Sequence, residues 1–199
     1  MRLALVVAAL LAALAIPAAL LLTRGGDEAD FRGSAAPDGF PLPSFTLHDD
    51  EGRMVRSSEL RGKAVAVTFL DARCTEACPI IAAQVGQAVR ALGDERSEYD
   101  ALAISVDPVA DTPARIDAFL KRYRAKGDLR YLDGSEAELR PLWKAFAVAA
   151  VPDTGSPNMH SAPVRIYDRE GRWRSTLSPG VDLTPANLVH DLREARDAS

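Results

Sequence analysis

The stretch AVAVTFLDARCTEACP, residues 64–79, decides the fold of this chain. Its first seven residues, 64–70, carry no charge, and larger apolar side chains alternate there with smaller ones. This pattern predicts a strand in a sheet that is covered on both faces. In the next segment, 79–92, apolar residues recur at helical spacing and stop at Gly93. A helix is therefore predicted directly behind the strand.

Cys74 and Cys78 lie where the predicted strand passes into the predicted helix. Four residues apart, they share one face if the first turn is helical, and the positive end of a helix favours a thiolate. Arg73 favours a thiolate further, whereas Asp71 and Glu76 oppose it, and the sequence does not settle that balance. Two thiolates held close together suit either a reversible disulfide or a soft metal ion. A disulfide across so short a loop removes little chain entropy. Chemistry is therefore favoured, with an inert disulfide or core packing as the alternative.

An apolar run from Leu3 to Leu22 precedes the rest of the chain and is long enough to cross a bilayer. It exceeds the usual signal-peptide core of roughly 7–15 residues, and no small-x-small cleavage site follows it. Residues 1–24 are therefore predicted to be an uncleaved, single-pass membrane anchor. Arg2 and the terminal amine favour a cytoplasmic N-terminus, which places the remainder on the extracytoplasmic, periplasmic side.

Residues 25–38, rich in Gly, Ala and charge, are predicted to be a tether, and residues 39–199 one domain. The net charge of −4 and the lack of a basic, aromatic-rich stretch argue against a nucleic-acid partner. Strands and helices alternate along the domain, which indicates an α/β sandwich with its site at the carboxyl end of a strand. The expected elements are a hairpin at 45–55, strands at 64–70, 101–106 and 129–132, helices at 79–92, from 112 to 124 and from 135, a hairpin at 163–177 and a last helix from 184.

Three features together resemble the Sco/SenC family of copper-handling proteins over residues 40–192. They are CxxxCP at 74–79, SxDPxxDTP at 105–113, and His160 ahead of the hairpin glycine Gly171. The resemblance implies a thioredoxin-like sandwich, with a central mixed sheet flanked by helices, on one N-terminal transmembrane helix. It also implies a copper site of Cys74, Cys78 and His160. Such a site would serve assembly of the copper centre of a respiratory terminal oxidase. The implied partners are the copper-centre subunit of that oxidase and a copper donor or thiol reductant.

The chain departs from the family pattern close to the predicted ligands. Asp71 and Ala72 stand where the family has an aromatic residue and a Thr, and Thr75 stands where it has a Pro. Met159 replaces the acidic residue that usually precedes the histidine. These differences bear on metal affinity and redox potential rather than on the fold or the ligand set.

His160 also has support that does not depend on the family. It lies in a loop that leads into a predicted strand, and such a loop can lie across from the cysteine-bearing turn. Imidazole beside two thiolates suits copper, with a surface histidine as the alternative. Asp107 and Asp111 either hydrogen-bond to the site loop or serve ordinary turn and cap roles. By analogy with thioredoxin-like folds, the bond before Pro163 is predicted to be cis.

Two functions fit these residues. The first is a copper metallochaperone that delivers copper to a terminal oxidase or matures its copper centre. The second is a membrane-anchored thiol–disulfide oxidoreductase that uses Cys74 and Cys78 without metal, so the sequence leaves open whether the protein is an enzyme. A reductase has no use for a soft-ligand histidine, and His160 therefore favours the chaperone. A peroxidase is less favoured because the chain has no cysteine outside the pair to resolve the oxidised thiol.

Overall fold

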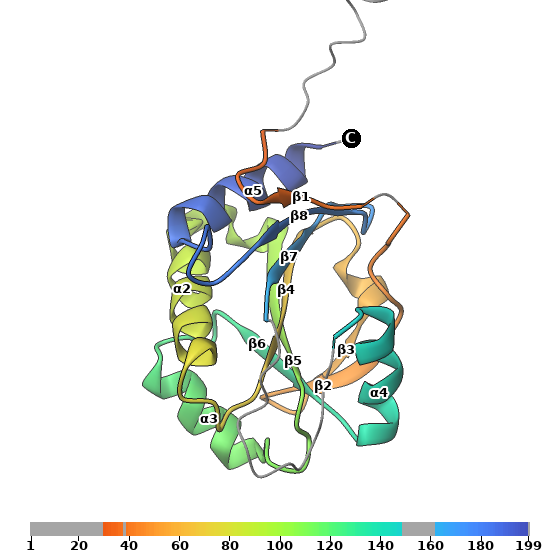
Figure 1. Ribbon diagram of the computed structural model, residues 1–199, viewed down its shortest axis with the longest axis vertical. Helices are drawn as coiled ribbons and strands as arrows, with labels where there is room; N and C mark the ends of the chain where they lie inside the picture. The colour runs from red at the N-terminus through yellow and green to blue at the C-terminus, as the bar shows by residue number, and fades with distance from the viewer. Residues whose placement is uncertain (1–29, 38, 149–161, 199) are drawn as a thin grey trace, which may run out of the picture. The chain divides into compact units, whose positions relative to one another are not determined.

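A computed structural model describes residues 30–37, 39–148 and 162–198 of the chain (Figure 1). The strands are β1 (Ser34–Ala35), β2 (Thr46–Asp49), β3 (Met54–Arg56), β4 (Ala64–Leu70), β5 (Tyr99–Ser105), β6 (Arg130–Asp133), β7 (Val164–Tyr167) and β8 (Trp173–Leu177). The α-helices are α2 (Ala77–Ala91), α3 (Pro113–Arg122), α4 (Glu136–Ala145) and α5 (Pro185–Asp197), with short 3-10 helices η1 (Ser57–Leu60) and η2 (Gly93–Glu98).

The strands form one eight-stranded mixed sheet with the order β1-β8-β7-β4-β5-β6-β2-β3. β5 pairs in parallel with both β4 and β6, whereas β7 pairs antiparallel with β4. Every residue of β4 is buried, because helices cover both faces of the sheet. In Figure 1, α2 and α5 lie against one face and α4 against the other. The predicted α/β sandwich is therefore confirmed, with the cysteine-bearing strand at its centre.

Local sequence signals set the starts of the helices. The Thr112 hydroxyl accepts a hydrogen bond from the first turn of α3, and Pro113 occupies the first helical position. Ser135 and Glu138 form the predicted capping box of α4. α2 begins at Ala77, two residues before the predicted start, so that Cys78 lies in its first turn.

The segment predicted as a tether contains a strand that the sequence did not indicate. β1 pairs antiparallel with β8, with Ser34 opposite Thr176. The fully buried Asp191 on α5 accepts hydrogen bonds from the backbone N–H groups of Arg32 and Gly33 at 2.8 and 3.1 Å. A β-carbon on Gly33 would lie 2.6 Å from the Thr176 carbonyl oxygen, so glycine permits this close approach. The compact unit thus begins at Phe31.

The prediction of a cis bond before Pro163 is wrong. The peptide bonds of the described residues, including Ala162–Pro163, are all trans. The prediction depended on a fold analogy, whereas trans is the ordinary isomer of an X–Pro bond. The Ala162 carbonyl lies 3.5 Å from the Thr68 hydroxyl, which donates to it across the start of β7.

Within the described ranges, no helix has the length and apolar character needed to cross a bilayer. The predicted anchor within residues 1–24 lies outside those ranges and stays a prediction.

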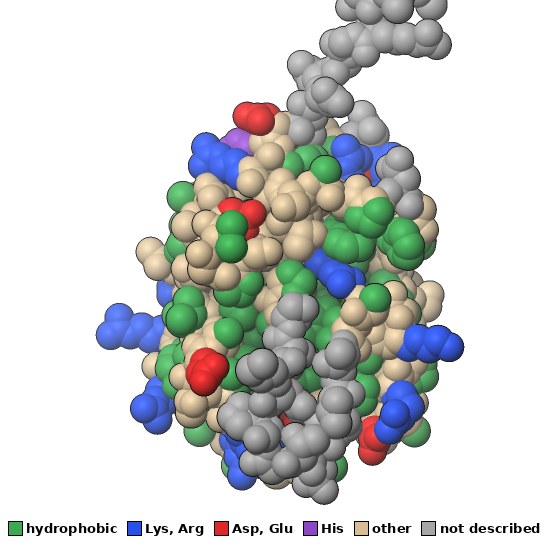
Figure 2. Space-filling model, in the orientation of Figure 1, with side chains coloured by type: hydrophobic (Ala, Val, Ile, Leu, Met, Phe, Trp, Pro, Cys, Tyr) green, Lys and Arg blue, Asp and Glu red, His purple; other side chains and the backbone are tan. Residues whose placement is uncertain are grey.

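Figure 2 shows that hydrophobic side chains gather in the middle of one face and that charged side chains lie mostly toward its margin. Among the large hydrophobic side chains that the structure describes as exposed are Ile80, at 53%, and Val109, at 62%. They lie in the segments that follow β4 and β5. These same segments carry the cysteines and the SxDPxxDTP motif.

Candidate metal centre

The two cysteines lie at the junction of β4 and α2, as predicted. β4 ends at Leu70, a short loop carries Cys74, and Cys78 lies in the first turn of α2. Both side chains are free thiols, and only 8% of Cys74 and 2% of Cys78 is exposed. The Cys74 backbone N–H donates to the Asp71 carbonyl at 3.0 Å, which turns the loop back over the end of the strand. The pair is therefore a buried dithiol.

The protonation of Cys78, which the sequence leaves open, depends mainly on burial. Burial raises the pKa of its thiol well above the usual range, and a side-chain hydrogen bond to Cys74 raises that pKa further. A hydrogen bond to the Asp71 backbone acts in the opposite direction but does not outweigh burial. The start of the helix therefore fails to produce a Cys78 thiolate in the metal-free protein, because desolvation opposes it more strongly. A bound cation or a disulfide takes the place of the proton, so that no uncompensated thiolate charge has to be buried.

The loop beside the cysteines is rich in buried carboxylates. Asp71 and Asp107 are fully buried, and Asp111 is 1% exposed. Arg73 pairs with Asp107, and its Nε lies 3.8 Å from Asp71 Oδ1. Asp71 Oδ2 has no hydrogen-bond partner among the described residues. Three carboxyl groups beside one guanidinium make these surroundings suit a cation.

The third predicted ligand, His160, lies outside the described residues. Within the part of the chain that the structure describes, no group of three or more His, Cys, Asp or Glu side chains is arranged to hold a metal ion. The structure thus brings together two of the three predicted ligands, and His160 stays a prediction. Two adjacent sulfurs fit a soft cation such as Cu(I), since thiolates are soft ligands.

A buried polar network below the loop includes residues that the sequence did not single out. Asp111 Oδ1 accepts from the Ala72 backbone N–H at 2.9 Å, and Asp111 Oδ2 accepts from the hydroxyls of Ser105 and Tyr131, both at 2.7 Å. Of the two predicted alternatives for Asp111, the structure supports the bond to the site loop. Asp107 has both predicted roles. It pairs with Arg73 of the site loop, and it stabilises its own turn by accepting from the Ala110 backbone N–H at 3.1 Å. Ser105 begins the SxDPxxDTP motif, whereas Tyr131 lies in a predicted strand, and no motif marks it as a residue near the site.

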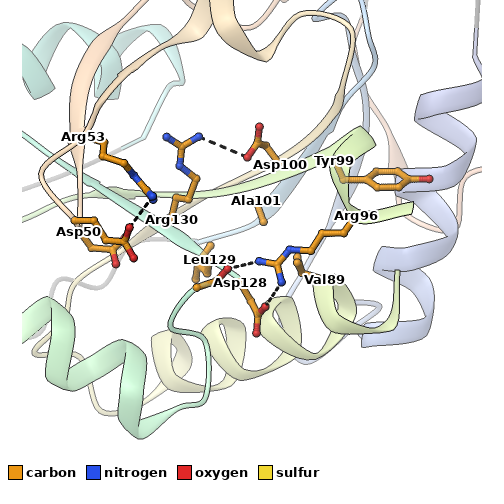
Figure 3. Close-up of a pocket in the computed structure, with 12 residues that line it drawn as sticks. Asp50, Arg53, Val89, Arg96, Tyr99, Asp100, Ala101, Asp128, Leu129 and Arg130 are labelled. Carbon is orange, nitrogen blue, oxygen red and sulfur yellow. Dashed lines mark hydrogen bonds and ion pairs between the residues drawn. The ribbon is translucent and has the colours of Figure 1, made fainter. Parts of the chain in front are cut away.

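The pocket in Figure 3 lies near the starts of β5 and β6, at the opposite ends of these parallel strands from the cysteines. It has a volume of about 120 Å³. Arg96 pairs with Asp128 at 2.8 Å, and Arg130 pairs with Asp100 at 3.6 Å. Because its arginines are paired with carboxylates, we interpret the pocket as an ion-paired surface rather than as a second site.

Comparison with known proteins adds independent evidence. The sequence profile of the SCO1/SenC family matches residues 38–196. A SCO2-like protein of Rickettsia felis is 26% identical over 155 residues, which cover 75% of this chain and 74% of that protein. A putative copper-binding protein of Stutzerimonas stutzeri is 27% identical over 147 residues, 71% of each chain. The solved structure of Bradyrhizobium japonicum ScoI with copper bound superposes with a TM-score of 0.67 at 28% identity, and the match covers 78% of this chain and 99% of that one. These matches confirm the thioredoxin-like fold.

Proposed function

The chain belongs to the SCO1/SenC family, and we propose from this membership that it binds copper and serves assembly of the copper centre of a respiratory terminal oxidase. The observation that carries the proposal is the buried pair of free thiols, Cys74 and Cys78, at the β4–α2 junction. The similar ScoI structure of Bradyrhizobium japonicum has copper bound. We assign Cys74, Cys78 and His160 as the ligands of this chain.

The roles of the ligands follow from their chemistry. Thiolates suit Cu(I), whereas an imidazole nitrogen suits Cu(II), so Cys74 and Cys78 supply the softer part of the site and His160 the harder part. Copper binds a thiolate and therefore displaces the thiol proton. Because burial holds that proton firmly on Cys78, copper affinity should rise steeply with pH. The buried carboxylates beside the loop add an electrostatic attraction for the cation.

Delivery to the oxidase is proposed to take place at a membrane. Residues 1–24 would hold the domain at the periplasmic surface, close to the copper-centre subunit that receives the ion. A copper donor or a thiol reductant is then needed to load the site, because an oxidised pair offers no thiolate to copper.

A thiol–disulfide oxidoreductase is the second candidate, and one observation favours it. Both cysteines are free thiols buried at the same β4–α2 junction, which is the arrangement that a reversible disulfide needs. Cys74 would attack, because a protonated and buried Cys78 is a poor nucleophile. This reading uses the same two residues but gives His160 no part.

The proposal is tested by copper titration of the full-length chain in detergent, with its thiols reduced. We expect the wild type to bind one copper ion per chain, and Cys74→Ala and Cys78→Ala each to abolish tight binding. Oxidising the pair to a disulfide should also abolish binding, and re-reduction should restore it. Asp94→Ala, at an exposed position in η2, is the control that should bind normally. Full copper affinity in either cysteine variant would reject the assigned site.

A further inference from the structure

Asp111 lies below the loop that carries Cys74, although the two residues are far apart in sequence. Its side chain is 1% exposed and lies in the segment between β5 and α3. One oxygen accepts from the Ala72 N–H at 2.9 Å. The other accepts from Ser105, the last residue of β5, and from Tyr131 on β6, both at 2.7 Å. A single carboxylate therefore joins the cysteine loop to two strands.

The Tyr131 hydroxyl connects this carboxylate to the end of β4. Its oxygen lies 2.7 Å from Asp111 Oδ2 and 2.8 Å from the Leu70 carbonyl oxygen, but it has only one proton to donate. When Asp111 is ionised, the charge-assisted bond to the carboxylate is the stronger of the two. When Asp111 is protonated, it can donate to Tyr131, whose own proton then turns to Leu70. The protonation of Asp111 is thus transmitted to the residue from which the cysteine loop starts.

We propose that Asp111 is a positioning residue for the dithiol: its carboxylate ties the Ala72 amide to β5 and β6 and so sets where Cys74 lies relative to Cys78. Cys78 lies on α2, and Ile81, one turn further along that helix, is fully buried in the core. Because the helix is fixed by this packing, the loop that carries Cys74 is the part that can adjust. The inference rests on the proposed use of the two cysteines as the working pair. It does not depend on which metal they hold.

A consequence for proton binding follows from this geometry. We expect disulfide formation to draw Cys74 toward Cys78 and so to lengthen the bond from the Ala72 amide to Asp111, which is 2.9 Å in the dithiol form. A carboxylate that loses a hydrogen-bond donor has a higher pKa, so the disulfide form should hold the Asp111 proton more tightly than the dithiol form. Burial already raises the pKa of Asp111 to about 6, which makes the effect measurable near neutral pH. The charged and titratable groups around this network are Asp71 and Arg73 in the loop, Asp107 beside them, Tyr131 on β6, Cys78 on α2 and Arg115 on α3.

The test is the equilibrium of the metal-free full-length chain with dithiothreitol. In this reaction the protein dithiol and oxidised dithiothreitol give the protein disulfide and reduced dithiothreitol, so two electrons and two protons pass between the partners. The equilibrium constant is therefore flat from about pH 5 to about pH 8 unless another group changes its proton affinity. For the wild type we expect the constant for disulfide formation to rise by about threefold to tenfold as the pH falls through the pKa of Asp111. We call this rise in the equilibrium constant the pH step.

Three variants assign the effect. Asp111→Asn keeps an oxygen for the Ala72 amide but is neutral at every pH, so the step should disappear. Tyr131→Phe removes one donor from the carboxylate, so the step should move to higher pH. Asp191→Asn is the matched control: Asp191 is fully buried and likewise accepts backbone N–H groups and a serine hydroxyl, that of Ser175 at 2.6 Å. It holds β1 rather than the cysteine loop, so its variant should keep the wild-type step.

A flat wild-type profile, a step of the opposite sign, or a step that survives Asp111→Asn would overturn the proposal. If Asp111→Asn does not fold, Tyr131→Phe decides, because an unmoved step in that variant also overturns it. A wild type that fails to bind copper would reject the proposed function, yet it would leave the outcome of this metal-free test unchanged.

Discussion

Cys78 is almost fully buried in the first turn of α2, and Cys74, in the loop before that helix, is buried as well. At the scale of single residues, this burial keeps the Cys78 thiol protonated, because a thiolate there would lose its hydration without gaining a cation. Copper binding and disulfide formation both replace the proton. The same environment therefore serves either use of the pair, and it makes both uses depend on pH.

The raised pKa of Cys78 predicts that the reduced, metal-free chain loses stability in alkali. Below about pH 8.5, the ordinary pKa of a thiol, Cys78 is protonated in the folded and the unfolded chain. Above it only the unfolded chain releases the proton, so the free energy of unfolding falls by up to about 1.4 kcal/mol per pH unit. Urea unfolding at about pH 8 and about pH 9.5 measures this loss.

Cys78→Ala provides the comparison. Without the titrating thiol, this variant should lose about 1 kcal/mol less than the wild type over the same interval. Both pH values lie below the ordinary pKa of tyrosine, about 10, so the buried tyrosines contribute little to the difference. Equal losses in the two chains would mean that the pKa of Cys78 is not raised.

The sequence located the cysteines correctly but left the protonation of Cys78 open. Adjacent residues indicate that a strand ends and a helix begins, and the helix start argues for a thiolate. Burial depends instead on how α2 packs against the sheet, which no local pattern contains. For the same reason the sequence could not place Tyr131 beside Asp111. Their hydrogen bond joins residues that come together only when β5 and β6 pair.

At the scale of secondary structure, the strands and α-helices with local signals were predicted, whereas β1 and the two short 3-10 helices were not. The strand at 64–70 has an uncharged apolar run, and α3 and α4 have capping residues at their starts. β1 is two residues long and has no periodicity, and its partner β8 lies at the other end of the chain. Its position depends on the carboxylate of Asp191, which tertiary packing brings to it.

Asp191→Ala should therefore release β1 and destabilise the domain. The substitution leaves the N–H groups of Arg32 and Gly33 and the Ser175 hydroxyl without their acceptor. An unsatisfied buried donor costs about 1–3 kcal/mol, so we expect the free energy of unfolding to fall by at least about 2 kcal/mol. Urea unfolding measures the loss, and hydrogen exchange should show reduced protection near residues 32–36.

The exposed Asp94 in η2 offers a matched control, because Asp94→Ala removes a carboxylate at the surface. Its effect should stay within about 0.5 kcal/mol. An Asp191→Ala chain as stable as this control, with protected amides at 32–36, would show that Asp191 does not hold β1.

At the scale of the whole molecule, the alternation of strands and helices was enough to predict the class of fold. The mixed sheet with β4 at its centre confirms that prediction. The resemblance to the Sco/SenC family, drawn from three motifs, is confirmed by the match over residues 38–196. His160 and the apolar run from Leu3 to Leu22 lie outside the described ranges, so the third ligand and the anchor stay predictions.

The anchor is tested by fractionation of cells that express the full chain. We expect the protein in the membrane pellet, extracted by detergent but not by salt or alkali, since an apolar span inserts into the hydrocarbon core. A chain without residues 1–24 should be soluble. Mass spectrometry should find Met1 or Arg2 at the mature N-terminus, and a terminus between Ala18 and Gly25 would reject an uncleaved anchor.

The central claim is that Cys74, Cys78 and His160 form a copper site, and the affinities of His160→Ala for Cu(I) and Cu(II) test it most directly. Cu(II) requires the imidazole, so its affinity should fall by about a hundredfold or more, equivalent to about 2.8 kcal/mol. Cu(I) can be held largely by the two sulfurs, so its affinity should fall by less than about tenfold. His48→Ala, at an exposed position on β2, is the control and should change neither affinity. If His160→Ala also changes neither, while the wild type reduces disulfides rapidly, the copper assignment is wrong and the protein is a thiol–disulfide oxidoreductase.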